Sequence, residues 1–170
     1  MIVDLFSVTD QPLTFDFRVA PDEIDLETEG VRIKGDVAVS GRLQRNAAVD
    51  VRGSIKAPLE IDCTRCLAPV KQELNLEFHV DFVDKEFFPD SKETHLETSE
   101  LDTDIIEGNE LDLTEIVREQ ILLNLPEQVL CSEDCKGICP TCGTDLNKTG
   151  CSCGENELDP RWAALKDLRD

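Results

Sequence analysis

The sequence predicts an α+β fold: an antiparallel β-sheet able to curl into a barrel, one packed helix, a zinc-ribbon-like appendage and a C-terminal helix. Three observations lead to this prediction. Apolar and polar residues alternate with the period of a strand up to residue 82. A capped stretch with helical spacing begins at Asp112. Six of the eight cysteines lie between residues 131 and 153.

Four alternating runs predict the strands of the sheet. Each run keeps its apolar side chains at positions of one parity, which is typical of a sheet with one buried face. In the third run, Gly53 is expected to mark a bulge and Pro58 an edge or a break. The apolar positions are Leu13, Phe15, Phe17 and Val19; Val31, Ile33, Val37 and Val39; Val49, Val51, Ile55, Leu59 and Ile61; and Leu74, Leu76, Phe78, Val80 and Phe82.

A helix is predicted over residues 113–124, packed on the apolar face of the sheet. Asp112 suits the N-cap position, and Glu115 three residues later would complete a capping box. Pro126 ends the helix. Its inner stripe comprises Leu113, Ile116, Val117, Gln120, Ile121, Asn124 and Leu125.

The remaining segments complete the expected domain organisation. Residues 81–112 carry 12 acidic and 2 basic side chains, and we interpret them as an acidic connector. Asp159 and Pro160 predict the start of the C-terminal helix, which carries Trp162. The chain is therefore divided into a β-rich core domain, 1–130, and a cysteine-rich zinc-binding segment with the C-terminal helix, 131–170.

The eight cysteines form four close pairs, and this pattern indicates two metal sites. The sequence shows neither a secretory signal nor a membrane span, so a cytoplasmic location is expected, where close-set thiols indicate metal binding more often than disulfides. Four thiolates complete a tetrahedral zinc site that is structural rather than catalytic. We therefore predict two structural Zn²⁺ ions and no enzymatic activity. The candidate ligands are Cys63, Cys66, Cys131, Cys135, Cys139, Cys142, Cys151 and Cys153.

Two divisions of these cysteines between the sites are possible. The Cys139-Pro-Thr-Cys142-Gly motif is typical of a zinc knuckle, and Cys151-Ser-Cys153 can supply its second pair. Cys131 and Cys135 would then join Cys63 and Cys66, and we prefer this division. In the alternative, Cys131, Cys135, Cys139 and Cys142 form one site, and Cys63, Cys66, Cys151 and Cys153 form the other.

Other interpretations fit the thiols less well. The spacing Cys135-x3-Cys139-x2-Cys142 occurs in radical SAM enzymes, but those need a much larger barrel than this chain can form. An iron–sulfur cluster on four thiolates is possible in principle, although paired cysteines suit zinc better. Neither Cys-x-x-Cys pair has the βαβ setting of a thiol oxidoreductase. A redox-responsive thiol protein or sensor is the alternative function. We expect neither His79 nor His95 to be a ligand.

The formal net charge of −20 constrains the partners. Nucleic-acid phosphates are usually bound by Lys and Arg, and the sequence shows no basic stripe, so neither DNA nor naked RNA is an expected ligand. A basic protein is the expected partner of such an acidic chain.

Several motifs, in this order, closely resemble the bacterial YceD family. The resemblance covers most of the chain, although the first 30 residues and the acidic connector contribute little to it. It implies a non-enzymatic role in the accumulation of large-subunit (23S) ribosomal RNA, and so in ribosome biogenesis, in bacteria and plastids. The expected partner is then a basic ribosomal protein or a large-subunit precursor particle. The motifs are Cys63-Thr-Arg-Cys66-Leu67, Asp112-Leu-Thr-Glu-Ile-Val-Arg-Glu-Gln-Ile121, Leu125-Pro126, Cys131-Ser-Glu-Asp-Cys135-Lys-Gly-Ile-Cys139-Pro-Thr-Cys142-Gly143 and Asp159-Pro-Arg-Trp-Ala-Ala-Leu165.

Overall fold

A computed structural model describes residues 1–8, 11–46, 48–84, 103–106 and 108–154 of the chain. The chain divides into two compact units, of which the first comprises Met1–Ile61 and Val70–Glu127 and the second Asp62–Pro69 and Gln128–Asp170. Residues 62–69, which the sequence analysis assigned to the core domain, thus belong to the cysteine-rich unit. The predicted C-terminal helix and His95 lie outside the described residues.

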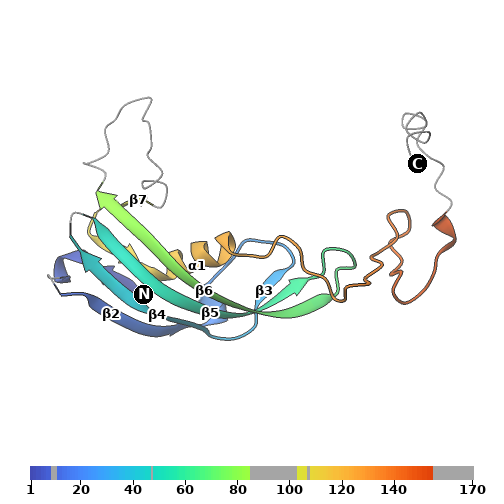
Figure 1. Cartoon of the computed structure of the whole chain (residues 1–170), viewed down its shortest axis with the longest axis horizontal. Helices are drawn as coiled ribbons and strands as arrows, with labels where there is room; N and C mark the ends of the chain where they lie inside the picture. The colour runs from blue at the N-terminus through green and yellow to red at the C-terminus, as the bar shows by residue number, and fades with distance from the viewer. Residues whose placement is uncertain (9–10, 47, 85–102, 107, 155–170) are drawn as a thin grey trace, which may run out of the picture. The chain divides into compact units, whose positions relative to one another are not determined.

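The first unit is built on a six-stranded sheet with the order β2-β4-β5-β6-β7, and β3 pairs with β5 beside this path (Figure 1). A separate two-stranded sheet joins β1 to β8. The strands are β1 (Ile2–Asp4), β2 (Leu13–Val19), β3 (Val31–Ile33), β4 (Val37–Arg45), β5 (Val49–Asp62), β6 (Pro69–Asp84), β7 (Thr103–Ile106) and β8 (Glu110–Asp112). Among the described residues, the 3-10 helices of the first unit are η1 (Leu5–Ser7) and η2 (Pro21–Glu23), and η5 (Ser152–Gly154) belongs to the second unit.

The expectation of a barrel is wrong, because the described strands form an open sheet with β2 and β7 at its ends. The sheet is also not wholly antiparallel. β2 pairs antiparallel with β4, as do β4 and β3 with β5, but β7 runs parallel to β6. A parallel neighbour needs a long crossover, and the 18 residues between Asp84 and Thr103 are long enough to provide one.

The predicted alternation of buried and exposed residues is confirmed for β4 and β5, whereas some predicted core positions in β2, β3 and β6 are only partly buried, namely Phe17, Val31, Ile33, Leu74, Leu76 and Val80. Phe15 and Val19 of β2 are buried, whereas Leu13 at the start of that strand is 38% exposed. The remaining buried positions in β4, β5 and β6 are Val37, Val39, Leu43, Val49, Val51, Ile55, Ala57, Leu59, Ile61, Phe78 and Phe82. One face of the sheet therefore contributes to the core of the first unit. Burial of its apolar surface stabilises the fold by about 25 cal/mol per Å².

Gly53 does not mark a bulge, contrary to expectation. The β4–β5 ladder runs without interruption through Ser40↔Ser54, Gly41↔Gly53 and Arg42↔Arg52. A Cβ atom on Gly53 would lie 2.6 Å from the carbonyl oxygen of Ser40 and 2.8 Å from the ring of Phe78, so glycine is needed here for the close approach of both.

Pro58 lies where one neighbour of β5 changes from β4 to β3, and it does not interrupt the strand itself. The ladder with β4 ends at Lys56, and the ladder with β3 begins at Leu59. Pro58 lies between the two ladders, where its missing N–H group removes no ladder hydrogen bond.

Part of the segment interpreted as an acidic connector is regular structure. Strand β6 continues to Asp84, and both β7 and β8 lie within residues 81–112. Residues 85–102 and 107 lie outside the described part of the chain. The acidic composition of the segment therefore did not reveal the short strands within it, of which β8 leads directly into the helix.

The predicted helix is confirmed as α1 (Leu113–Leu123), which lies alongside the sheet (Figure 1). Its buried residues are Leu113, Ile116, Val117 and Ile121, all of them in the predicted stripe. Asp112 is the N-cap, and its carboxylate accepts a 2.9 Å hydrogen bond from the N–H of Thr114. Glu115, predicted to complete a capping box, has its carboxylate 2.9 Å from Arg118 Nη1. In the described part of the chain, no helix is long and apolar enough to span a membrane.

Replacing Asp112 by alanine is expected to destabilise the first unit by about 1 kcal/mol, a typical cost for a lost N-cap. Burial alone would raise the pKa of this carboxyl, but hydrogen bonds from Thr114 and the charge of the Met1 amino group outweigh burial and lower it. The stabilisation is therefore present above the ordinary carboxyl pKa and is lost as the pH falls through the lowered value. Urea denaturation at several pH values measures this, with Glu127→Ala as an exposed control. An equal loss of unfolding free energy in the two variants would show that Asp112 does not stabilise the helix as an N-cap.

Candidate metal centre: two groups of four cysteines

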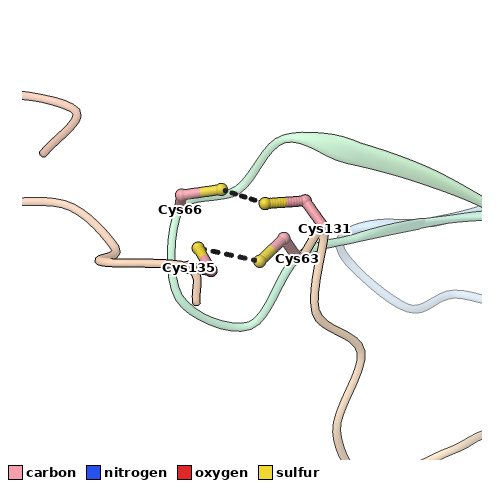
Figure 2. Close-up of side chains that lie close together, drawn as sticks. All are labelled: Cys63, Cys66, Cys131 and Cys135. Atoms are coloured by element: carbon pink, nitrogen blue, oxygen red, sulfur yellow. Dashed lines mark hydrogen bonds between the residues drawn. The ribbon is translucent and has the colours of Figure 1, made fainter. Parts of the chain in front are cut away.

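The structure brings all eight cysteines into two groups, each of which has its four sulfur atoms within 4.8 Å of one another. We term Cys63, Cys66, Cys131 and Cys135 the first group (Figure 2), and Cys139, Cys142, Cys151 and Cys153 the second group. Both groups lie within the second unit. This is the division preferred from the sequence, and the alternative division is not the one observed.

The turn between β5 and β6 places the first two cysteines. The N–H of Cys63 donates to the carbonyl of Ala68 at 2.8 Å, and Leu67 takes a positive φ of 60° that closes the turn. Thr64 connects this turn to the segment that carries the other two cysteines, because its N–H and its hydroxyl both donate to the carbonyl of Val129. Hydrogen bonds thus hold together the two chain segments that carry the cysteines of the first group.

The sulfur separations in the first group match a tetrahedral metal site. Cys63 and Cys135 have their sulfurs 3.8 Å apart, and Cys66 and Cys131 have theirs 3.5 Å apart. A zinc–sulfur bond of about 2.3 Å gives a tetrahedron with edges of about 3.8 Å, whereas a disulfide needs about 2.05 Å. All four side chains point toward one another (Figure 2), and the thiols are free.

The charges within the first group favour a bound cation. Burial opposes ionisation of Cys63, yet the backbone N–H groups of Arg65 and Cys66 lower its pKa to about 6. The N–H of Ala68 favours a thiolate at Cys66, but burial and the neighbouring thiols raise that pKa to about 12. Four thiolates this close together would repel one another, and a divalent metal ion could provide the positive charge that offsets the repulsion.

A tight turn forms the first half of the second group. The N–H of Gly143, at φ 73°, donates to the carbonyl of Cys139 at 2.8 Å. Hydrogen bonds from the side chain and backbone of Thr144 lower the pKa of Cys142 to about 6. The neighbouring Cys142 raises the pKa of Cys153 to about 12. The ribbon itself stays a prediction, because residues 128–154 contain a single isolated bridge, Ile138↔Asp145, and the helix η5.

The second unit has little hydrophobic core of its own. Among its described residues, the buried apolar side chains are Val129 and three cysteines, namely Cys63, Cys135 and Cys139. A chain segment with so little apolar burial usually needs disulfides, metal ions or a partner to stay folded. The cysteines therefore occupy the place that aliphatic side chains hold in an ordinary core.

A third cluster of potential ligands lies on the outer face of the sheet. His79 is exposed, and its Nε2 lies 2.9 Å from Asp50 and 3.4 Å from Asp81. Arg52 donates three hydrogen bonds to the Asp50 carboxylate. Burial tends to raise the pKa of Asp50, but the bonds from Arg52 and His79 outweigh it and lower the pKa. Since Arg52 already neutralises this carboxylate, we interpret the cluster as an ion-pair network.

The same outer face carries basic residues that the sequence analysis did not single out. Arg42 lies directly opposite Arg52, while Arg18 and Lys56 flank Ala38. All four cations are exposed. Like charges opposite each other on a sheet are unfavourable unless something offsets them. The sequence could have indicated these residues, because they lie at the polar positions of the alternating strands.

The chain is similar to several known proteins. The family model described as "Large ribosomal RNA subunit accumulation protein YceD" matches residues 51–169. The uncharacterized protein YlbN of Bacillus subtilis is 30% identical over 169 residues, which cover 98% of this chain and 94% of YlbN. The uncharacterized protein Rv2926c of Mycobacterium tuberculosis is 32% identical over 118 residues, 69% of this chain and 54% of that protein. No solved structure matches.

A plant relative carries the name of the family. The chloroplastic "Large ribosomal RNA subunit accumulation protein YCED homolog 1" of Arabidopsis thaliana is 36% identical over 64 residues, 38% of this chain and 20% of the plant protein. The present chain spans about half the length of the mycobacterial relatives it matches.

Fold and site together define a protein with an open β-sheet unit and a cysteine-rich unit that could hold two metal ions. The chain belongs to the YceD family, as its motifs indicated.

Proposed function

We propose that this protein is a non-catalytic factor of ribosome biogenesis, which promotes the accumulation or processing of 23S ribosomal RNA in the cytoplasm and holds two structural zinc ions. The family description and the name of the plant relative support the ribosomal role, since both refer to large-subunit ribosomal RNA and neither names a reaction. The observation that carries the structural part is the second unit, whose buried described residues are mainly cysteines.

Zinc is the metal that best suits both groups. Soft thiolates select zinc, copper(I) or iron–sulfur clusters among biological metals. In a cluster the thiolates bind different metal atoms, so some of them lie far apart, whereas all four sulfurs of each group lie within 4.8 Å of one another. A mononuclear site closed by four protein ligands leaves no open position for water or substrate, so its role is structural.

The charge distribution favours a precursor particle or a basic ribosomal protein as the partner. The chain has a net charge of −20, which attracts basic proteins and repels free RNA. Three cations on the outer face of the sheet reduce that repulsion locally, namely Arg18, Arg42 and Lys56, whereas Arg52 is paired with Asp50. A precursor particle presents both basic proteins and RNA. Its proteins can bind the acidic surface of the chain, and its RNA can lie against the cations of the sheet.

Deletion of the gene is expected to lower the ratio of 23S to 16S ribosomal RNA, and a plasmid copy should restore it. Cys63→Ser should fail to restore the ratio, because the variant loses a buried ligand of the first group. Glu133→Gln, an exposed change between two cysteines, should restore it. Northern blots of total RNA measure the ratio. An unchanged ratio after deletion would refute the ribosomal role.

Binding experiments test the partner. The tagged wild-type protein is expected to co-sediment with large-subunit precursors, whereas the pure protein should bind 23S fragments weakly at physiological salt. Tight, sequence-specific binding to the naked RNA would overturn this part of the proposal.

A redox-responsive thiol protein remains the second candidate function. Cys66 and Cys131 are less buried than their group partners, and their sulfurs lie 3.5 Å apart, close enough to form a disulfide after a small movement. Metal analysis with thiol counting separates the two functions. Two zinc ions per chain, with eight thiols released on unfolding, support the structural role. A metal-free protein with a reversible disulfide supports the sensor.

A further inference from the structure

Residues 143–150 form the loop that connects Cys142 to Cys151, two cysteines of the second group. This loop also contacts the first group. The N–H of Leu146 donates to the carbonyl of Gly137 at 2.9 Å, and Ile138 forms a β-bridge with Asp145. This loop therefore pairs with the segment that directly follows Cys135.

Asn147 is the residue of this loop that reaches a cysteine of the first group. Its Nδ2 atom donates to the sulfur of Cys135 at 3.5 Å, and its Oδ1 atom accepts from the N–H of Lys136 at 2.8 Å. The second contact fixes the orientation of the amide, because only the oxygen can accept from an N–H group, and so the NH₂ group must face the sulfur.

Asp145 holds Asn147 in this position. One carboxylate oxygen of Asp145 accepts from the backbone N–H of Asn147 at 3.0 Å and from its Nδ2 at 2.9 Å, while the other lies 3.0 Å from Lys148 Nζ. Contacts within the loop therefore hold the amide in this orientation. Such preorganisation reduces the entropy cost of forming the contact with sulfur.

An N–H donor to a metal-bound thiolate stabilises the negative charge on sulfur and fixes the direction of the ligand. Substitution of such outer contacts typically weakens metal binding 10- to 100-fold. Here the donor comes from the loop whose two ends carry the second group, Cys139 and Cys142 at one end and Cys151 and Cys153 at the other. A metal ion in the second group closes this loop.

We propose that Asn147 is a positioning residue that couples the two cysteine groups, so that metal binding to the second group raises the metal affinity of the first. The inference rests on the proposed metal binding of both groups. Coupling between two binding sites is reciprocal, so occupancy of the first group also strengthens metal binding to the second by the same factor.

Cobalt(II) is the probe, because its thiolate complexes have charge-transfer bands that zinc lacks. The purified full-length chain is stripped of metal and titrated with cobalt against a competing chelator. Alkylation of the free thiols, mapped by mass spectrometry, assigns each bound ion to its group. The variants are Asn147→Ala, Asn147→Asp, the double variant Cys142→Ser/Cys153→Ser, which disables the second group, and the triple combination with Asn147→Ala. Thr149→Ala, exposed in the same loop, is the control.

Asn147→Ala is expected to weaken cobalt binding to the first group about tenfold and to shift its charge-transfer band, with two ions still bound at saturation. Asn147→Asp keeps the acceptor for Lys136 but lacks the donor to sulfur, so it should weaken binding at least as much. Disabling the second group should also weaken the first, and adding Asn147→Ala to that variant should change nothing further, because both changes remove one interaction. Thr149→Ala should resemble the wild type.

Two results would overturn the coupling while leaving metal binding intact. One is an Asn147→Ala variant whose first group binds cobalt within about twofold of the wild type. The other is a triple variant in which the two losses multiply. If the double variant does not fold, the comparison of Asn147→Ala, Asn147→Asp and the wild type still decides, because Asn147 is exposed and its substitution leaves no buried cavity. A wild-type chain that binds no cobalt would overturn both the metal function and the coupling.

Discussion

Cys63→Ser is expected to unfold the second unit while the first unit stays folded. Cys63 is fully buried, and its sulfur lies 3.8 Å from that of Cys135 in the first group. The second unit has almost no other buried apolar side chains among its described residues. Structural zinc supplies on the order of 10 kcal/mol to the folding of small zinc domains, far more than this unit can recover from its remaining contacts. The zinc content should fall from two ions per chain to one or none.

Hydrogen exchange can locate this unfolding. The amides of Thr64, Ile138 and Leu146 donate to backbone carbonyls within the second unit, and they should lose protection in the variant and in wild type treated with a chelator. Peptides from β5 and α1 should keep theirs, because those elements belong to the first unit. Glu133→Gln serves as the control with unchanged zinc. Protection of the second unit that survives the loss of metal would show that the cysteines do not hold it together.

The cysteine arrangement could be predicted from the sequence because it depends on counting ligands. The close motif around Cys139 and Cys142 accounts for four thiols, and the remaining four have no other partners. The bonds that surround the ligands could not be predicted in this way. Asn147 lies 12 residues from Cys135 in the sequence, and only the folded loop brings its amide to the sulfur.

The errors in the fold prediction share a physical cause. A local pattern defines which face of a strand is buried, but the choice of neighbouring strand depends on contacts between residues distant in sequence. Gly53 was interpreted from its own flexibility, whereas its role comes from the close approach of Ser40 and Phe78 on the neighbouring strands. Strand β7 was also missed, because it lies in the segment interpreted as an acidic connector. Its parallel pairing with β6 joins residues distant in sequence. The helix was predicted well because its cap and its buried stripe are local features.

Gly41→Ala is expected to destabilise the first unit by about 3 kcal/mol, at the upper end of the range for overpacked cores. A Cβ atom on Gly41 would lie 2.6 Å from Cζ of Phe15 and 2.8 Å from the Cα of Gly53, and closer still to the carbonyl oxygen of Arg52. Two of these three contacts are to the backbone of β5, which cannot move away without breaking the central β4–β5 ladder. Urea denaturation followed by circular dichroism measures the change.

Two further variants show whether the backbone contacts are the cause. Ser40→Ala changes the neighbouring residue on the exposed face, removes a 3.1 Å contact with Ser54 and should cost less than about 1 kcal/mol. Phe15→Leu removes the ring carbon that the new methyl group would meet, but it leaves the carbonyl of Arg52 in place. Combining it with Gly41→Ala should therefore not restore stability. If the double variant did recover the wild-type free energy of unfolding, the ring and not the paired backbone of β5 would explain why glycine occupies position 41.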